Sequence, residues 1–210
     1  MKEQNDNESK RNSLTKIMDW MIEKGQQSVT EYVESLHNLN PDISSNDLAK
    51  KIVSRKSFKA GLVGAATGVG GLLTLPVAVP ADLAKCWQIQ IFMTLAIAKA
   101  FGHNINTVDI KTDIYLIMAG NSAGEALKRL GIEVGKDITK KTINKYVTRE
   151  VMVKIWKVIS QKIITKAGQK SFTSFMKMVP LVGAPIGFTF DWITTKTIGK
   201  YAIKYYSGGE

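Results

Sequence analysis

Residues 60–81 read AGLVGAATGVGGLLTLPVAVPA, twenty-two consecutive residues without a charged side chain. A helix of this length would suffice to cross the hydrocarbon core of a membrane. Five glycines, together with Pro76 and Pro80, argue against one straight helix, because proline removes a backbone hydrogen bond and bends the chain. The stretch therefore predicts the first leg and the tip of a bent, apolar helical hairpin.

A second apolar helix is predicted over residues 86–98 (CWQIQIFMTLAIA), between Lys85 and Lys99. Gly102 follows its last turn, where glycine commonly ends a helix because it tolerates a left-handed backbone. The predicted hairpin therefore extends over residues 60–101, with prolines at its tip.

Small residues recur at helical spacing in both uncharged parts of the chain. Gly64 and Gly68 are four apart, as are Gly183 and Gly187 in a second uncharged stretch, residues 178–190 (MVPLVGAPIGFTF). This spacing lets another backbone approach closely, either in lipid or in a tight core. Thirteen residues cannot span a bilayer as a helix, so the second stretch is expected to enter one leaflet or to pack beside the first hairpin. The residues expected to insert into a membrane or to pack the hairpins are Gly64, Gly68, Val69, Leu73, Pro76, Pro80, Trp87, Pro180, Gly183 and Gly187.

The N-terminal part of the chain is polar at first and then amphipathic. Residues 1–12 predict a disordered lead-in, because they offer almost no apolar surface to bury. From residue 14 to 36, apolar positions recur every three or four residues, which predicts an amphipathic helix that is interrupted near Gly25.

The next helices are indicated by their end signals. After a break at Pro41, Ser44 or Ser45 is placed to cap a helix that reaches about residue 57. Residues 13–57 are thus expected to form N-terminal amphipathic helices. Residues 109–130 predict a further helix, broken near Gly120.

Positive charge is concentrated in residues 136–170, which hold ten basic residues against Asp137 and Glu150; the whole chain of 210 residues has a net charge of +11. An apolar stripe around Trp156 indicates a basic amphipathic helix. Such a helix can lie in a membrane interface with its lysines on anionic headgroups, although a core helix with a solvated lysine face is the commoner case. The lysines expected to contact anionic lipid are Lys140, Lys141, Lys145, Lys154 and Lys157.

The sequence supports no catalytic or metal-binding constellation. Residues 120–124 satisfy the G-x-S-x-G pattern around Ser122, but both histidines, His37 and His103, precede that serine, whereas the triad order requires a later histidine. Two distant histidines and the single Cys86 do not form a metal site, and the glycine-rich stretch lacks a P-loop signature. No catalytic residue, metal or cofactor is therefore assigned.

Two aspartates each follow an uncharged stretch, and capping of the next helix is their favoured role. They are Asp82 and Asp191. The alternative is a soluble hydrolase or transferase with a site around Asp82, Ser122 and Asp191, which requires the three side chains to meet in one polar pocket.

The stretch from residue 64 to 82 (GAATGVGGLLTLPVAVPAD) resembles the hallmark of the EcsC family, a glycine-rich run that leads into Leu-Pro-x-x-x-Pro. The same order of features continues through residues 100–102, 120–135 and 179–191. The resemblance covers roughly residues 58–206 and is most specific in its two Gly/Pro segments. Two positions depart from the family's pattern, since Asp82 stands where asparagine is usual and Phe92 where arginine is usual.

The resemblance implies a helical, membrane-associated protein and brings no established set of catalytic residues. The family is named for a protein encoded beside an ABC transporter, so an ABC-type transporter or another membrane protein is an expected partner. Some members carry a hydrolase label, which keeps the alternative of a soluble enzyme open.

We therefore expect an all-α protein, a single-domain helical bundle with two Gly/Pro-rich apolar helical hairpins. Residues 13–206 should form one folded unit, in which residues 58–206 are the EcsC-like part. Residues 1–16 hold no apolar stretch behind a basic start, which predicts a cytoplasmic protein at the inner face of a membrane. The positive charge would suit nucleic acid as well as anionic lipid, but no zinc finger or RNA-binding aromatic motif accompanies it, so lipid is the expected partner.

Overall fold

The computed structural model describes residues 2–69, 81–107, 109–120, 123–124, 127–128, 138–146 and 180–208. Every regular element among these residues is a helix, which confirms the all-α prediction. The helices are α1 (Lys2–Asn38), α2 (Ser45–Val69), α3 (Ala81–Ala100), α4 (Ile110–Ala119), α6 (Lys140–Tyr146) and α8 (Pro180–Tyr206).

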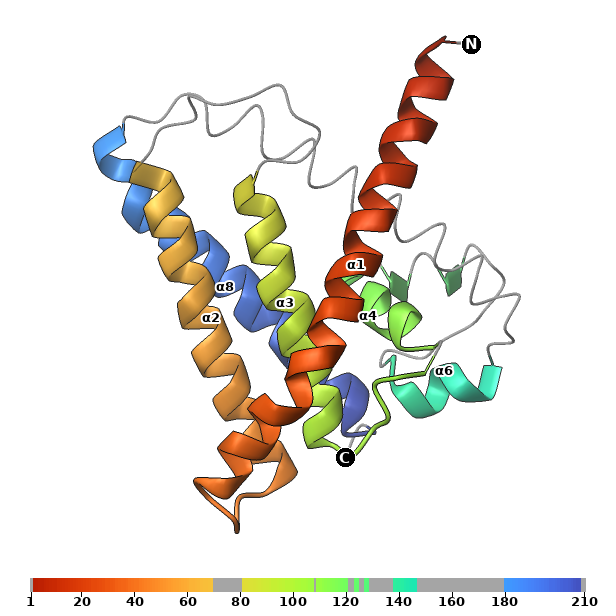
Figure 1. Cartoon of the computed structure of the whole chain (residues 1–210), viewed down its shortest axis with the longest axis vertical. Helices are drawn as coiled ribbons and strands as arrows, with labels where there is room; N and C mark the ends of the chain where they lie inside the picture. The colour runs from red at the N-terminus through yellow and green to blue at the C-terminus, as the bar shows by residue number, and fades with distance from the viewer. Residues whose placement is uncertain are drawn as a thin grey trace.

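Three long helices, α2, α3 and α8, lie side by side and form one layer of the molecule (Figure 1). Helix α1 lies across α3, while α4 and α6 lie on the side of the molecule away from α2 (Figure 1). The chain reverses direction between α2 and α3. Consequently the end of α2 and the beginnings of α3 and α8 all lie at one end of the layer, opposite the turn that joins α1 to α2 (Figure 1).

Helices α2 and α8 pack antiparallel at glycine positions. A Cβ atom added to Gly64 would lie only 2.4 Å from the Gly187 carbonyl oxygen, and one added to Gly187 would lie 2.3 Å from the Gly64 oxygen. At the other end of the contact, a Cβ atom on Gly199 would meet the Val53 side chain at 2.6 Å. The prediction that glycines at this spacing allow a close backbone approach is therefore confirmed for Gly64 and Gly187, which face each other.

One hydrophobic core joins the six helices of the described part of the chain. It includes Ile22 of α1, Ile52 of α2, Ile91 of α3, Ile114 of α4 and Ile143 of α6, together with side chains of α8. Each such side chain contributes roughly 1.5–3 kcal/mol on burial, so the shared core ties the helices into one unit. This agrees with the expectation of a single folded bundle.

Glycines end the helices where the sequence predicts. Gly102 follows α3 with φ 78°, and His103 N–H donates to the Ala98 carbonyl at 2.9 Å, closing the last turn of α3. Gly120 ends α4 with φ 53°, and its N–H donates to the Leu116 and Ile117 carbonyls. Both positive φ values favour glycine over any residue with a side chain.

Two predictions about the N-terminal helix are wrong. Residues 2–12, expected to be disordered, form the first turns of α1, because extending an existing helix requires far less ordering free energy than nucleating one. Gly25 does not interrupt α1 either. A Cβ atom there would lie 2.8 Å from Leu95 Cδ1, so this glycine allows α3 to approach α1 closely.

The boundaries of the predicted hairpins also change. The helix expected to stop near residue 57 continues to Val69, so it forms one helix with the first leg of the predicted hairpin. The second Gly/Pro stretch does not form a hairpin over residues 180–190, because α8 begins at Pro180 and continues through Pro185. The tip of the first hairpin, including Leu73, Pro76 and Pro80, lies outside the described residues.

Candidate functional site

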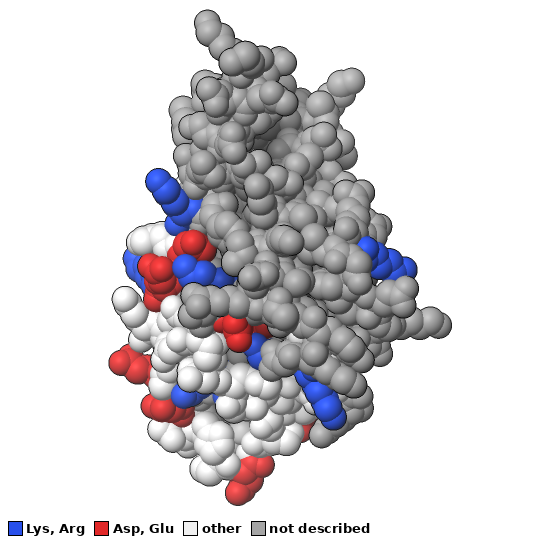
Figure 2. Space-filling view, turned by 90° about the vertical axis from the view of Figure 1, so that its right-hand side faces the viewer, with Lys and Arg blue, Asp and Glu red and all other residues white. Residues whose placement is uncertain are grey.

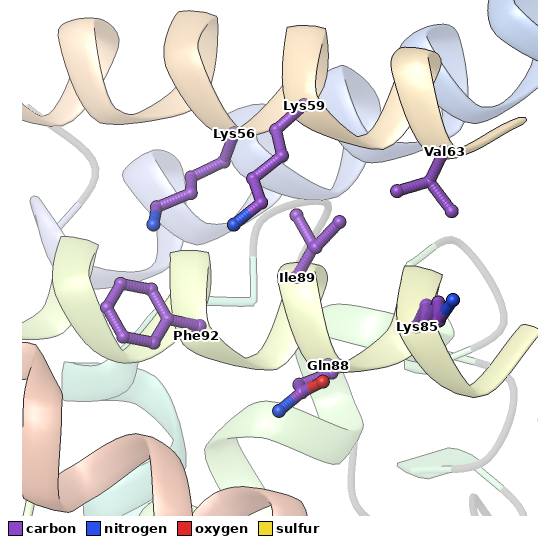
Figure 3. A pocket seen from close by; sticks show the side chains of 7 residues that line it. All are labelled: Lys56, Lys59, Val63, Lys85, Gln88, Ile89 and Phe92. Carbon is purple, nitrogen blue, oxygen red and sulfur yellow. The ribbon is translucent and has the colours of Figure 1, made fainter. Parts of the chain in front are cut away.

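A pocket of about 440 Å³ lies between α2 and α3. Its basic side chains are Lys56 and Lys59 of α2 and Lys85 of α3, and in Figure 3 Lys56 and Lys59 extend from α2 toward α3. Lys59 and Lys85 are exposed, so the pocket opens to solvent. Val63, Gln88, Ile89 and Phe92 complete the lining.

Three lysines line this pocket, spaced along it from Lys56 beside Phe92 to Lys85 at the other end (Figure 3). Among the described residues, no aspartate or glutamate forms an ion pair with Lys56, Lys59 or Lys85. Lys56 is the most buried of the three, and its Nζ lies 4.0 Å from the Tyr32 ring centroid and 3.9 Å from that of Phe92. Burial, and next the charge of Lys59, lower the pKa of Lys56 to about 8.

Charges elsewhere are mixed or paired. Figure 2 shows acidic and basic side chains interspersed on the described surface of one face. Lys111 of α4, for example, forms ion pairs at 3.4 Å with both Asp19 and Glu23 of α1. The α2–α3 pocket therefore differs from these surfaces in holding basic groups alone.

A polar cluster lies inside the three-helix layer, between α3 and α8. The Gln90 amide donates to Thr195 Oγ1 and to Cys86 Sγ, each at 3.2 Å. Burial, with the nearby Asp191 carboxylate as the next cause, raises the pKa of the Cys86 thiol to about 12. A thiol held in its protonated form is a poor nucleophile, so this arrangement packs the helices together rather than activating sulfur.

A second buried cluster joins α4, α6 and the end of α8. The Asp113 carboxylate accepts from Lys140 Nζ at 2.6 Å, from the Tyr205 hydroxyl at 2.6 Å and from the Tyr206 hydroxyl at 3.5 Å. Burial raises the pKa of Asp113, although the Lys140 charge and the hydrogen bonds oppose that shift. The same carboxylate and burial raise the pKa of Tyr205 well above its usual value. His103 also contacts the Tyr206 carbonyl oxygen at 3.0 Å.

The predicted polar site around Asp82, Ser122 and Asp191 is only partly described. Asp191 lies near Cys86 and close to Gly64 at the crossing of α2 and α8. Ser122 and the Asp82 side chain lie outside the described residues. Residues 110–119, which precede the G-x-S-x-G pattern, are helical, whereas a nucleophile elbow follows a strand.

The lysines predicted to contact lipid are described in part. Lys140 is mostly buried and paired with Asp113, so its ammonium group is engaged inside the fold. Lys141 is exposed on α6. The Lys145 side chain, Lys154 and Lys157 lie outside the described residues.

Several residues predicted to insert or to pack can be located. Trp87 is only 6% exposed and belongs to the core, while Gly64 and Gly187 pack against each other. For four further members of the set, the structure describes only the helical backbone. They are Gly68, Val69, Pro180 and Gly183. Packing thus accounts for those members of the set whose surroundings are described.

The lysine pocket is the feature that sequence reasoning missed. Lys59 directly precedes the long uncharged stretch, Lys85 follows it shortly after Asp82, and Lys56 lies three residues before Lys59 on the same helix face. Their spacing within α2 could have indicated a basic face. Only the antiparallel packing of α2 on α3 brings Lys85 to it.

The described part of the chain offers neither a membrane-spanning helix nor a cluster of metal ligands. No helix there has a segment long and apolar enough to cross a bilayer. No group of three or more histidine, cysteine, aspartate or glutamate side chains there is placed to bind a metal ion.

Comparison with known proteins extends the resemblance seen in the sequence. The model of the EcsC protein family matches residues 3–207, which include the N-terminal helices as well as the Gly/Pro segments. No curated protein and no solved structure matches the chain. Since the match covers nearly the whole length, this chain belongs to the EcsC protein family.

Proposed function

We propose that this EcsC-family protein attaches to a membrane surface through the end of the layer where α2 ends and α3 and α8 begin. The observation that carries the proposal is the convergence of these three helix ends (Figure 1). Residues 70–80, which join α2 to α3, and residues 178–190, which lead into and begin α8, are both uncharged. The described helix ends that border the two uncharged Gly/Pro stretches thus lie at a single end of the layer.

Exposed apolar side chains also lie around the middle of the same helices. Phe58 and Leu62, four apart on α2, are 55% and 51% exposed. Phe190 and Ile193, three apart on α8, are each 51% exposed. Apolar pairs at these spacings share one helix face, and exposed apolar faces commonly mark contact with lipid or protein.

Positive charge supplies the second part of the attachment. A membrane with anionic lipid attracts each nearby lysine or arginine by about 1 kcal/mol, and the chain carries a net charge of +11. We assign this role to Lys154 and Lys157. We exclude Lys140, whose ammonium group Asp113 holds, and Lys141 and Lys145, because α6 lies beside the end of α8 and away from the proposed membrane end (Figure 1). The attachment would then combine shallow apolar contact with electrostatic attraction.

The family resemblance supplies the proposed setting. We place the protein at the cytoplasmic face of the membrane, as an accessory to an ABC-type transporter or another membrane protein. Such a partner adds a protein contact to the lipid contact and requires no catalytic group.

Co-sedimentation with vesicles tests the attachment. The purified chain should pellet with vesicles containing anionic lipid, and the double substitution Val69→Asp with Leu73→Asp should abolish pelleting while leaving helicity unchanged. The matched control adds the same two charges at the opposite end, by Asn38→Asp with Leu39→Asp, and should pellet like the natural chain.

Pelleting that is equal for the two double variants would contradict the proposed orientation. Release by high salt would indicate attachment through lysines, whereas retention after a carbonate wash would indicate inserted apolar segments. Absence of pelleting with every vesicle would overturn the proposal and favour a soluble activity.

A further inference from the structure

The pocket between α2 and α3 combines an apolar wall with positive charge that no carboxylate of the described residues pairs. Its three ammonium groups come from Lys56, Lys59 and Lys85, and its apolar side chains from Val63, Ile89 and Phe92 (Figure 3). A volume of about 440 Å³ falls in the range of pockets that hold small organic ligands, which is roughly 300–1,000 Å³. This size exceeds what a bare inorganic anion would fill.

The positive charge of the lysines in the pocket favours the binding of an anion. Burying an ammonium group without a paired anion is unfavourable, and the lowered pKa of Lys56 reflects that cost. The charged groups around it are Lys59 and Arg55 on α2 and Lys85 on α3, and the ring of Tyr32 faces it from α1. All these cations would be stabilised by a ligand carrying one or two negative charges.

The apolar wall and the position of the pocket restrict the ligand further. Phe92 and Ile89 on α3 and Val63 on α2 offer no hydrogen bonds through their side chains, so they suit a hydrocarbon chain beside the anionic group. The lysine at position 59 lies ten residues before the end of α2, about 15 Å along the helix from the proposed membrane end.

We propose that this pocket binds the phosphate group of an anionic amphiphile, with Lys56, Lys59 and Lys85 around the phosphate and Val63, Ile89 and Phe92 along the adjoining acyl chain. The proposal rests on the proposed function for the source of the ligand, a phospholipid of the membrane. The charge, volume and lining residues of the pocket support an anionic amphiphile as the ligand even if the protein does not attach to a membrane.

Titration calorimetry with a soluble probe tests the pocket without a membrane. The probe is short-chain dioctanoyl phosphatidic acid below its micelle concentration, and inorganic phosphate is the comparison without an acyl chain. One molecule of the lipid should bind per chain. Inorganic phosphate should bind at least roughly tenfold more weakly, since it gains nothing from the apolar wall.

Two double variants separate the pocket from general charge. Lys59→Gln with Lys85→Gln should weaken lipid binding by on the order of a hundredfold, because each charge-assisted contact supplies roughly tenfold or more. Lys16→Gln with Lys200→Gln removes the same charge from exposed positions outside the pocket and should change binding less than about threefold. Circular dichroism verifies that both variants remain helical.

Equal losses in the two double variants, or no binding of the soluble lipid by the natural chain, would overturn the proposal. Equal affinity for inorganic phosphate would overturn the amphiphile and leave a soluble phosphate as the ligand. Failure of vesicle pelleting together with intact binding of the soluble lipid would refute the membrane attachment alone. Intact pelleting without binding of the soluble lipid would refute the pocket alone.

Discussion

At the scale of single residues, the contact between Gly64 and Gly187 decides how closely α2 and α8 approach. Each glycine would place an added Cβ atom within 2.4 Å of the other's carbonyl oxygen, and a backbone oxygen cannot rotate away as a flexible side chain can. Glycine in a helix costs about 1 kcal/mol relative to alanine. The packing that the two glycines permit must exceed that cost.

Gly64→Ala should therefore lower the free energy of unfolding by roughly 1–3 kcal/mol, because α2 and α8 must separate to accept the methyl group. Urea denaturation followed by circular dichroism measures the change. Gly124→Ala is the control, since among the described side chains its Cβ atom would meet only Ile138 Cδ1, at 4.0 Å. That substitution should raise stability by about 0.5–1 kcal/mol. A stabilising effect of Gly64→Ala would contradict the observed crossing.

Lys56 should make stability depend on pH above neutrality. Its pKa in the folded chain is about 8, against 10.5 for an ordinary lysine, so the unfolded chain binds the proton more tightly between these values. Stability contributed by this residue should therefore rise as pH increases from 8 to 10.5. Lys56→Met keeps the apolar stem, and its stability relative to the natural chain should fall over this range. A difference that stays constant with pH would contradict the buried environment of Lys56.

At the scale of helices, side chains at the ends fix where elements begin and how they join. The Ser44 side chain accepts from Asp47 N–H at 3.1 Å and donates to the Asp47 carboxylate at 2.7 Å, which caps α2. The hydrogen bonds of Ser44 and Lys50 lower the pKa of Asp47. The predicted choice between Ser44 and Ser45 is thus resolved in favour of Ser44.

Ser44→Ala should lower the free energy of unfolding by about 1 kcal/mol, because the Asp47 N–H at the start of α2 loses its acceptor. Ser45→Ala, one position later, removes the same hydroxyl group where no capping bond is formed and should change stability by less than about 0.5 kcal/mol. Thermal unfolding of the two variants distinguishes them. A larger loss for Ser45→Ala would contradict the assigned cap.

The hydroxyl of Tyr205 should contribute strongly to the contact of α8 with α4. Tyr205→Phe removes a donor 2.6 Å from the buried Asp113 carboxylate and should cost roughly 1–3 kcal/mol. Tyr206→Phe removes a neighbouring hydroxyl that lies 3.5 Å from the same carboxylate, at the limit of a hydrogen bond, and should cost less. Urea denaturation of both variants measures the difference. An equal or larger loss for Tyr206→Phe would contradict this arrangement.

The positions of helices were predictable from the sequence, whereas several boundaries were not. Gly102 and Gly120 end helices as predicted, because each adopts a positive φ that favours glycine and leaves the helical conformation. Gly25 does not break α1, because core side chains on both sides of it, such as Ile22 and Val29, hold the helix, and α8 continues through Pro185 into a segment that packs in the core. Local sequence signals do not reveal the stabilisation that tertiary packing gives to a helix. This stabilisation exceeds the free-energy cost of one glycine or one proline in the helix.

The candidate site shows the same division between local and long-range information. Periodicity indicates that Gly64 allows a close approach but does not identify Gly187 as the residue it meets. Likewise, Lys59 and Lys85 are visible as charges beside an uncharged stretch, but their convergence with Lys56 depends on the packing of α3 against α2. Pairings between distant segments are set by the shared core, which single-sequence patterns do not specify.

At the scale of the whole molecule, charge and apolar character are distributed unevenly. Helices α2, α3 and α8 share a core with α1 and α4. The end of α2 and the beginnings of α3 and α8 lie at the same end of the molecule (Figure 1). The turn at Leu39, which is 70% exposed, lies at the opposite end. In the proposed attachment, the molecule approaches a bilayer in one orientation, with Lys59 of the pocket about 15 Å along α2 from the proposed membrane end.

The central claim, that the end bearing residues 70–80 meets the membrane, is tested most directly by measuring the surroundings of a probe at each end. In a Cys86→Ala background, an environment-sensitive fluorophore is attached to Leu73→Cys or, in a matched variant, to Leu39→Cys. With vesicles of anionic lipid, the probe at position 73 should shift to shorter wavelength and be quenched by nitroxide-labelled lipid, while the probe at position 39 should report water throughout. A water-exposed probe at position 73 on vesicle-bound protein, or a lipid-exposed probe at position 39, would contradict the account.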